Sequence, residues 1–138
     1  MKIAIVEDNK VLAILLKERL ETILEGKITI DLFFDFNDFI KNCNVYDYKF
    51  YIIDIILTES YNTGIDIVTF IKNIYKEPFG VYLTSCLDNT SFYIRAYKDV
   101  RDGYIYEIII KTEDIQSILK KIVYYIKITK DRVNGTRN

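Results

Sequence analysis

Two kinds of hydrophobic pattern alternate along this chain. Short, almost wholly apolar runs rich in β-branched residues are typical of strands buried on both faces, whereas apolar residues that recur every three or four positions are typical of amphipathic helices. Asn9 can cap the first helix, Gly26 follows its last turn, and Pro78 precedes the fourth strand. The predicted strands are Lys2–Val6, Ile28–Phe34, Phe50–Ile56, Phe79–Thr84 and Tyr104–Ile110. The predicted helices run from Asn9 to Leu24, over Asn37–Cys43, Gly64–Lys76 and Ser91–Tyr97, and from Thr112 to about Ile128.

Strands that alternate with helices in this way predict an α/β fold built from five βα units. Because strands that are apolar on both faces need helices over both, we expect a flavodoxin-like, doubly wound parallel sheet with strand order 2-1-3-4-5. In such sheets, functional groups gather beyond the carboxyl ends of the strands. We expect residues 1–128 to form one domain and residues 129–138 to form a polar C-terminal tail or linker stub.

Composition narrows the classes of function. The 138 residues are 50% hydrophobic and 28% charged, which fits one packed domain. No apolar run approaches the roughly 18 residues of a membrane span, and no secretory leader is visible. Two cysteines are too few for a disulfide framework and fit a reduced, cytoplasmic setting. The lack of histidine excludes Ser-His-Asp triads and histidine metal sites, and a net charge of −1 gives no overall positive field for nucleic acids.

Three acidic residues fall at the ends of the first and third predicted strands. Glu7 and Asp8 follow the first strand, and Asp54 lies near the end of the third inside an apolar run. The order 2-1-3 makes these strands neighbours, so the carboxylates should converge, and an all-oxygen cluster of this kind suits Mg²⁺. Glu7 and Asp8 have a simpler alternative role at the positive end of the next helix. Asp54 is harder to explain in that way, since an acid among apolar residues needs a partner.

Hydroxyl groups are expected at the same edge of the sheet, because Thr84 and Ser85 end the fourth predicted strand. A threonine at a strand end most often fills space or starts a turn. Beside an acidic phosphate site, the same hydroxyl could donate a hydrogen bond to an oxygen of a transferred phosphoryl group. The combination of acids and hydroxyls therefore carries more weight than either alone.

These residues resemble those of a known family. The run KIAIVEDN at Lys2–Asn9, the aspartate in FYIIDII, and Thr-Ser after FGVYL are similar to the response-regulator receiver domains of two-component signalling. The separations also agree with that family, with 46 positions from Asp8 to Asp54 and 30 from Asp54 to Thr84. The likeness covers about residues 1–128. Residues 84–98 further resemble the accessory-gene-regulator type, whose receivers precede a LytTR DNA-binding domain.

The resemblance implies a phosphorylation site with a bound metal. Asp54 would accept the phosphoryl group. Mg²⁺ would be held by Asp8, by Asp54 and by the backbone carbonyl of Ile56, and Glu7 would act through a bridging water. The domain would then be a phosphoacceptor that assists its own phosphorylation and dephosphorylation rather than an enzyme.

The resemblance also implies a switch and a lysine, and here the sequence departs from the family. Thr84 would be the switch hydroxyl, Tyr104 the aromatic that turns inward on activation, and Gly64 the glycine that opens the third helix. The family has a lysine, generally followed by proline, at the end of the fifth strand, where it contacts the phosphoryl group. A nearly gapless alignment puts Glu107 there, and Lys111 could substitute only if the strand holds an insertion or bulge.

The implied partners follow from the family's mode of signalling. A sensor histidine kinase would donate the phosphoryl group, and the face of the fourth helix, fifth strand and fifth helix would control an output, transcription being the expected one. DNA would be reached only through an output domain outside this chain, and no membrane partner is implied. Four tyrosines on that face either mediate a homodimer or are ordinary half-buried residues. They are Tyr97, Tyr106, Tyr124 and Tyr125.

Other readings of the sequence remain open. A pseudo-receiver, an interaction module that is never phosphorylated, fits the missing lysine-proline but not the intact acids. The loop Leu57–Thr63 also lacks the family's Met-Pro, and its Glu59 either approaches the acids or faces solvent. A flavodoxin needs a loop rich in Ser, Thr and Gly after the first strand, where this chain has EDNKVL, and a phosphohydrolase of the haloacid-dehalogenase type needs an Asp-x-Asp there.

Overall fold

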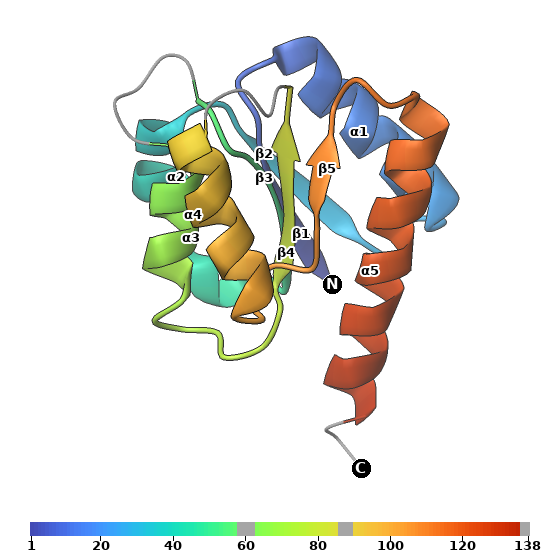
Figure 1. Cartoon of the computed structure of the whole chain (residues 1–138). Coiled ribbons are helices and arrows are strands. Elements are labelled where there is room, and N and C mark those ends of the chain that lie inside the picture. Colours follow the sequence, from blue (N-terminus) through green and yellow to red (C-terminus); the bar gives the residue numbers. More distant parts are fainter. Residues whose placement is uncertain (58–62, 86–89, 136–138) are drawn as a thin grey trace.

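The computed structural model describes residues 1–57, 63–85 and 90–135 of the chain (Figure 1). Strands and helices alternate along it, as the hydrophobic pattern predicts. The strands are β1 (Lys2–Val6), β2 (Thr29–Phe33), β3 (Phe50–Asp54), β4 (Gly80–Thr84) and β5 (Ile108–Ile110). The helices are α1 (Lys10–Ile23), α2 (Phe36–Asn42), the short 3₁₀ helix η1 (Val45–Asp47), α3 (Gly64–Ile71), α4 (Thr90–Arg101) and α5 (Ile115–Gly135).

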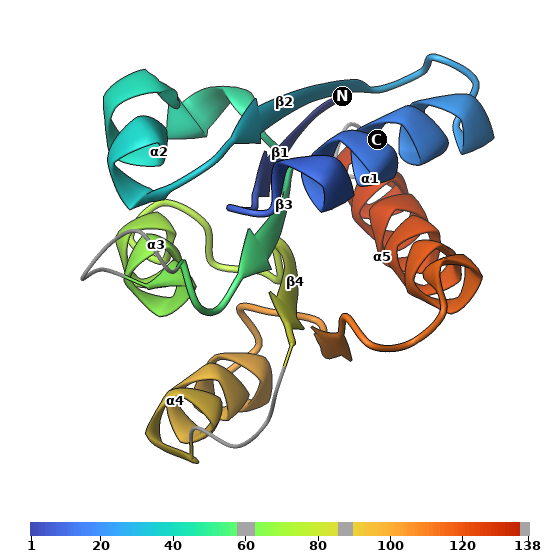
Figure 2. The ribbon, with the colours of Figure 1, turned by 90° about the horizontal axis from the view of Figure 1, so that it is seen from above.

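The strands form one parallel sheet in the order β2-β1-β3-β4-β5. Helices α1 and α5 lie on one face of the sheet and α2, α3 and α4 lie on the other (Figure 2). The predicted flavodoxin-like α/β fold and its strand order are therefore confirmed. Because all strands run in the same direction, their carboxyl ends meet at one edge, and the loops that follow them lie side by side there.

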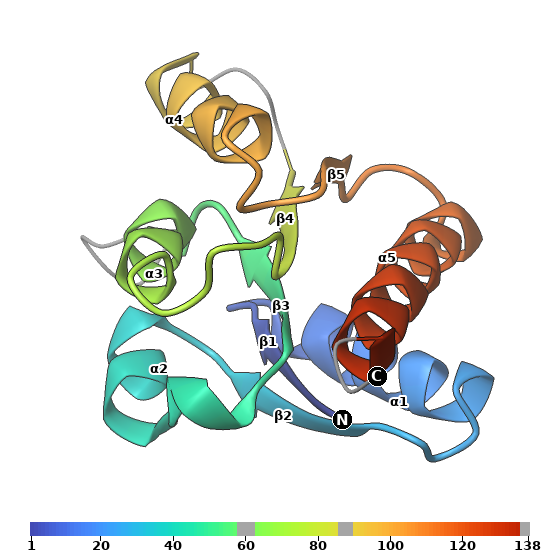
Figure 3. The same cartoon turned by 90° about the horizontal axis from the view of Figure 1, so that it is seen from below.

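The helices form two layers, one on each face of the sheet (Figure 3). Alternate residues of the strands belong to the two apolar clusters beneath these layers. Ile3, Ile5 and Ile52 pack with α1 and α5, whereas Ala4 and Ile53 pack with α2, α3 and α4. All of these side chains are buried. Side chains of a strand alternate between faces, so a strand that is covered on both sides must be apolar at every position.

Strand β5 begins later than predicted. We expected it to start at Tyr104, but it pairs with β4 over Ile108–Ile110. The preceding residues close the turn after α4, where the N–H groups of Tyr104 and Ile105 both donate to the carbonyl oxygen of Asp99, at 3.0 and 3.2 Å. Gly103 adopts a positive φ of 85° in this turn, a conformation that glycine tolerates well. The residues that put Lys111 farther along the chain than the family alignment expects therefore lie between α4 and β5. They do not form a bulge within β5.

Helix α5 is longer than predicted. We expected it to end near Ile128, but it continues to Gly135, so most of the predicted polar tail is helical. Arg132 anchors these added turns, because its Nε lies 2.7 Å from the carboxylate of Glu77 and its Nη2 donates to the carbonyl oxygen of Pro78 at 3.0 Å. In the part of the chain that the structure describes, no helix has both the length and the apolar character needed to cross a bilayer.

Other boundaries differ from the prediction by a few residues. Helix α3 ends at Ile71 rather than Lys76, α4 continues to Arg101 rather than ending at Tyr97, and β3 ends at Asp54 rather than Ile56. The early end of β3 matters for the site described next. It makes Asp54 the last residue of its strand, at the edge where the carboxyl ends of the strands meet.

Candidate functional site

The structure brings three carboxyl groups together at the carboxyl edge of the sheet. Strands β1 and β3 are neighbours in which Val6 pairs with Ile53, so Glu7 and Asp8 follow one strand where Asp54 ends the other. One carboxylate oxygen of each acid lies within 4.8 Å of the others. We call Glu7, Asp8 and Asp54 the acidic cluster. Its convergence is the geometry that the sequence predicted.

Two members of the acidic cluster are almost fully buried. Glu7 is 0% exposed and Asp54 is 3% exposed, whereas Asp8 is partly exposed. The backbone holds them in place, since the N–H of Glu7 donates to the carbonyl oxygen of Phe33 at 3.0 Å and the N–H of Ile56 donates to Asp54 Oδ1 at 3.2 Å. Two like charges in a dry site repel each other unless a cation lies between them.

Lys111 supplies positive charge to the acidic cluster. Its Nζ donates to Asp54 Oδ2 at 2.8 Å and lies 2.6 Å from Glu7 Oε1. The last pair of the β4–β5 ladder is Thr84 with Ile110, so Lys111 leaves β5 at the same edge, and its N–H donates to the carbonyl oxygen of Thr84 at 2.8 Å. Lys111 reaches the cluster without a bulge in the strand, because the extra residues lie between α4 and β5.

Glu107 does not lie at the acidic cluster. Its side chain points toward α5, where it accepts a hydrogen bond from the hydroxyl of Tyr125 at 2.6 Å and lies 3.3 Å from Lys121 Nζ. The sequence left Lys111 and Glu107 as alternatives for the place beside Asp54. In the structure, Lys111 is the residue that occupies it.

The charges in the cluster are not balanced. Burial raises the pKa of Asp54, the hydrogen bond and charge of Glu7 raise it further, and Lys111 only partly opposes this. Burial lowers the pKa of Lys111, but its two carboxylate neighbours outweigh that effect and raise it. Among the described residues, Glu7 Oε1 has no hydrogen-bond partner of good geometry, although the ammonium group lies close to it. The ammonium of Lys111, at 2.6 Å, is the cation that this buried oxygen meets.

Helix α3 begins directly against the backbone of Asp54. The N–H of Gly64 donates to the carbonyl oxygen of Ile55 at 2.8 Å, and a Cβ added at Gly64 would lie 1.9 Å from the carbonyl oxygen of Asp54. Thr63 and Asp66 form a capping box at this helix end. Gly64 therefore lets α3 pack closely behind the carboxylate, and any larger residue would push the two apart.

The switch residues that the resemblance implied lie at opposite ends of the sheet. Thr84 is the buried last residue of β4, next to Lys111. Tyr104 lies at the other edge, where its carbonyl oxygen accepts the N–H of Phe79, just before β4, at 3.0 Å. The resemblance implied that Tyr104 turns inward on activation, and the structure places it before β5, at the opposite end of β4 from Thr84. Glu59, for which the sequence left open an approach to the acids or a place facing solvent, lies outside the described residues.

Comparison with solved structures identifies the fold of this chain. No protein-family model matches the chain, and no curated protein matches it. Solved structures do. A two-component response regulator from Clostridium difficile has 24% sequence identity and a TM-score of 0.68, covering 97% of this chain and 98% of that one. The chain has the receiver-domain fold.

Further solved structures share the receiver fold. A CheY-like receiver domain protein from Methanospirillum hungatei has 16% identity and a TM-score of 0.71, covering 95% of this chain and 97% of that one. The response regulator TrrA from Thermotoga maritima, solved in complex with Mg²⁺ and BeF, has 19% identity and a TM-score of 0.66, covering 89% and 96%. The chain spans about half of another match, the Thermotoga maritima response regulator DrrB, of which 52% is covered.

Proposed function

We propose that this chain is the phosphoacceptor domain of a two-component signalling system, with Asp54 as the residue that is phosphorylated. The observation that carries the proposal is the geometry around Asp54. Its buried carboxylate ends a central strand, one oxygen accepts a hydrogen bond from Lys111 at 2.8 Å, and two further acids lie beside it. The receiver fold that the chain shares with solved response regulators supports the proposal.

The residues present fit a Mg²⁺ ion. Their donors are carboxylate oxygens, the hard ligands that Mg²⁺ prefers, and the buried carboxyl groups of Glu7 and Asp54 share the ammonium of Lys111. Asp8, Asp54 and the backbone carbonyl of Ile56 would bind the ion, and Glu7 would reach it through water. When bound, Mg²⁺ would neutralise the oxygens of the incoming phosphoryl group. The solved complex of TrrA with Mg²⁺ and BeF supports this assignment by analogy.

The transfer step uses an oxygen of Asp54 as the nucleophile. That oxygen forms a bond to the phosphorus of a phosphohistidine on a sensor kinase while the bond from phosphorus to the histidine nitrogen breaks, and the nitrogen keeps the electron pair. Most of the catalysis in such a step is positioning and charge stabilisation. Lys111 donates to an oxygen of the new acyl phosphate, and the hydroxyl of Thr84 moves to donate to another. The chain is therefore a participant in its own phosphorylation and not an enzyme with a separate substrate.

The output surface in this proposal is the face formed by α4, β5 and α5. Tyr97 and Tyr124 are 55% and 61% exposed there and are available to a second copy of the chain. Tyr106 and Tyr125 are instead half-buried and stacked on each other at 4.8 Å between centroids, so they serve the packing of α5 on the sheet. Control of transcription would need a DNA-binding domain outside residues 1–138, of the LytTR type or another, and partnership with a kinase places the domain in the cytoplasm.

The proposal is tested by chemical phosphorylation. Incubation with Mg²⁺ and acetyl phosphate should add one phosphoryl group to the wild type, detected in the intact mass, and none to Asp54→Asn. Asp131→Asn removes an exposed acid of α5 and should be labelled like the wild type. Equal labelling of Asp54→Asn, or no labelling of the wild type with acetyl phosphate and no response to beryllofluoride, would contradict the proposal. Mg²⁺ titration in parallel separates a phosphoacceptor from a pseudo-receiver, which need not bind the metal.

A further inference from the structure

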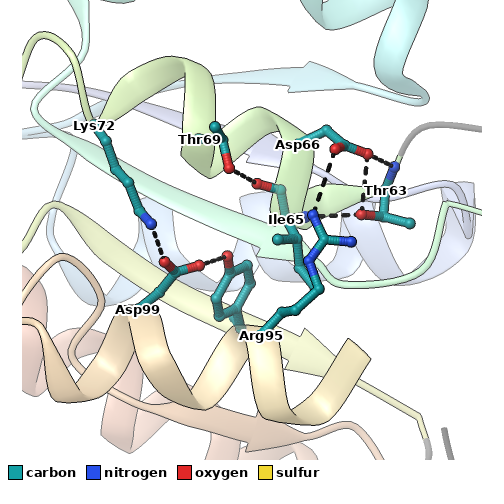
Figure 4. A network of polar contacts seen from close by, with 8 residues as sticks. Thr63, Ile65, Asp66, Thr69, Lys72, Arg95 and Asp99 are labelled. Atoms are coloured by element: carbon teal, nitrogen blue, oxygen red, sulfur yellow. Dashed lines mark hydrogen bonds and ion pairs between the residues drawn. The ribbon is translucent and has the colours of Figure 1, made fainter. Parts of the chain in front are cut away.

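A second cluster of charged side chains lies between α3, α4 and β4 (Figure 4). Its centre is Asp99, near the end of α4, which is 2% exposed. The hydroxyl of Tyr82, in the middle of β4, donates to Asp99 Oδ2 at 2.5 Å. Lys72, the residue that caps α3, forms an ion pair with the other carboxylate oxygen. We call Lys72, Tyr82 and Asp99 the Asp99 cluster.

The backbone of Asp99 is engaged as well as its side chain. Its carbonyl oxygen accepts the N–H groups of Tyr104 and Ile105, which lead the chain from α4 toward β5. The ammonium group of Lys72 lies 5.1 Å from the ring centre of Tyr104. Asp99 thus joins α4 to three other parts of the fold: the end of α3, the middle of β4 and the approach to β5.

Because Asp99 is buried, its contacts stabilise one position of α4 relative to the others. A carboxylate taken out of water is tolerated only while its partners stay in place, because a buried charge without them is strongly unfavourable. The same two helices share a second ion pair, Arg95 with Asp66 at 3.8 Å, whose side chains are 50% and 36% exposed. Water can replace that exposed pair when α4 shifts. The side chain of Asp99 is only 3% exposed, so water replaces its contacts less easily, although that of Lys72 is 29% exposed.

Strand β4 connects the Asp99 cluster with the acidic cluster. Tyr82 and Thr84 are two residues apart, so their side chains leave the strand on the same face. Thr84 accepts the N–H of Lys111 through its carbonyl oxygen, and Lys111 contacts Asp54. If Thr84 moves toward a phosphoryl group on Asp54, the end of β4 moves with it. Tyr82, whose hydroxyl binds Asp99, lies on the same strand and is therefore displaced as well.

We propose that Asp99 is a positioning residue that holds α4 on β4 and α3 and thereby couples the position of β4 to the outer face of α4. That outer face exposes Ile94 and Tyr97. The holding role stands on the described contacts alone. The coupling to Asp54 rests on the function proposed above, and the two are tested separately.

The holding role is tested by hydrogen exchange of the backbone amides of the whole chain. In Asp99→Asn, which keeps the size of the side chain but removes its charge, exchange of the α4 amides should accelerate about tenfold or more, because the lost charged contacts no longer oppose opening. Tyr82→Phe, which removes only the hydroxyl, should give a smaller acceleration in the same amides. Arg95→Gln is the matched control and should leave them within about twofold of the wild type. Unchanged exchange in Asp99→Asn, or an equal acceleration in α1 and α5, would overturn the holding role, since the latter is the result of a general loss of stability.

The coupling is tested by adding Mg²⁺ and beryllofluoride to the same variants. In the wild type, the additives should change the exchange of α4 amides. In Asp99→Asn, the affinity for Mg²⁺ should stay within about twofold while the response of α4 is lost. A full response of α4 in Asp99→Asn overturns the coupling. A wild type that binds neither additive counts against the proposed function and leaves the result for holding α4 as it stands.

Discussion

The two buried clusters of this molecule differ in how their charges are matched. In the acidic cluster, the two buried carboxyl groups of Glu7 and Asp54 share the ammonium of Lys111, and Asp8 lies beside them. In the Asp99 cluster, one carboxylate meets one ammonium and one hydroxyl, so each of its two oxygens has a partner. A surplus of buried negative charge is stable only if something else joins it, whereas a matched set is complete within the fold. The acidic cluster therefore has the character of a binding site, whereas the Asp99 cluster has the character of a structural contact that holds α4 in place.

The largest effect should come from breaking the matched cluster. Asp99→Ala leaves the ammonium of Lys72 and the hydroxyl of Tyr82 without their acceptor and should lower the free energy of unfolding by about 3 kcal/mol. Urea denaturation measures the change. The triple variant Lys72→Met, Tyr82→Phe, Asp99→Leu should recover most of the loss, because apolar groups can replace a buried ion pair at little cost. A triple variant as unstable as the single one would show that unmatched charge is not the cause.

A second effect should come from disturbing the acidic cluster through its backbone, with no change of charge. Gly64→Ala places a methyl group 1.9 Å from the carbonyl oxygen of Asp54, so the start of α3 or the end of β3 must move. We expect a loss of about 2 kcal/mol in urea denaturation and a weaker affinity for Mg²⁺ in a titration. Gly135→Ala is the matched control, since nothing lies within 4 Å of its added methyl group. Equal behaviour of the two variants would mean that the close approach at Gly64 is unimportant.

The third prediction is a change of free energy of unfolding in the opposite direction to that of Asp99→Ala. Glu7→Gln removes one negative charge from the acidic cluster and leaves Asp54 paired with Lys111. Without metal, the free energy of unfolding should rise by about 1 kcal/mol, because the repulsion that raises the pKa of Asp54 is relieved. Addition of Mg²⁺ should stabilise this variant less than the wild type. If Glu7→Gln destabilises the metal-free protein as Asp99→Ala does, the acidic cluster is a matched one and the contrast fails.

The smallest effect is expected at the exposed ion pair of α3 and α4. Arg95→Gln should change the free energy of unfolding by no more than about 0.5 kcal/mol, since both partners lie largely in water. The same urea experiment measures it. A loss comparable to that of Asp99→Ala would mean that burial does not distinguish the two links between these helices.

Much of this architecture could be predicted from the sequence, because it depends on local patterns. Apolar runs such as Lys2–Val6 and Phe50–Ile56 identify strands covered on both faces, and the handedness of βα units then leaves few strand orders. Asp54 was identifiable because one acid in an apolar strand needs a partner. The neighbourhood of Asp54 with Glu7 follows from strand order alone, without knowledge of any side-chain conformation.

The parts that could not be predicted depend on where extra residues are accommodated. Counting from Thr84 does not reveal whether the chain lengthens before β5 or within it, so Lys111 and Glu107 remained alternatives and the predicted start of the fifth strand at Tyr104 was too early. Asp99 was missed for a different reason. The predicted helix ended at Tyr97, so Asp99 fell outside it among the charged residues Lys98 and Arg101. A signal was present, because Asp99 continues the spacing of the inward-facing Phe92 and Ala96 at steps of four and three.

The late start of β5 has a consequence for recognising similar chains. The lysine beside Asp54 is placed by the end of a strand, and its distance along the chain from the hydroxyl that ends β4 can vary while its place in space stays the same. A search that counts residues across this region would reject a protein whose ammonium is correctly located. Aligning the last paired residues of the two strands, Thr84 with Ile110 here, would find it.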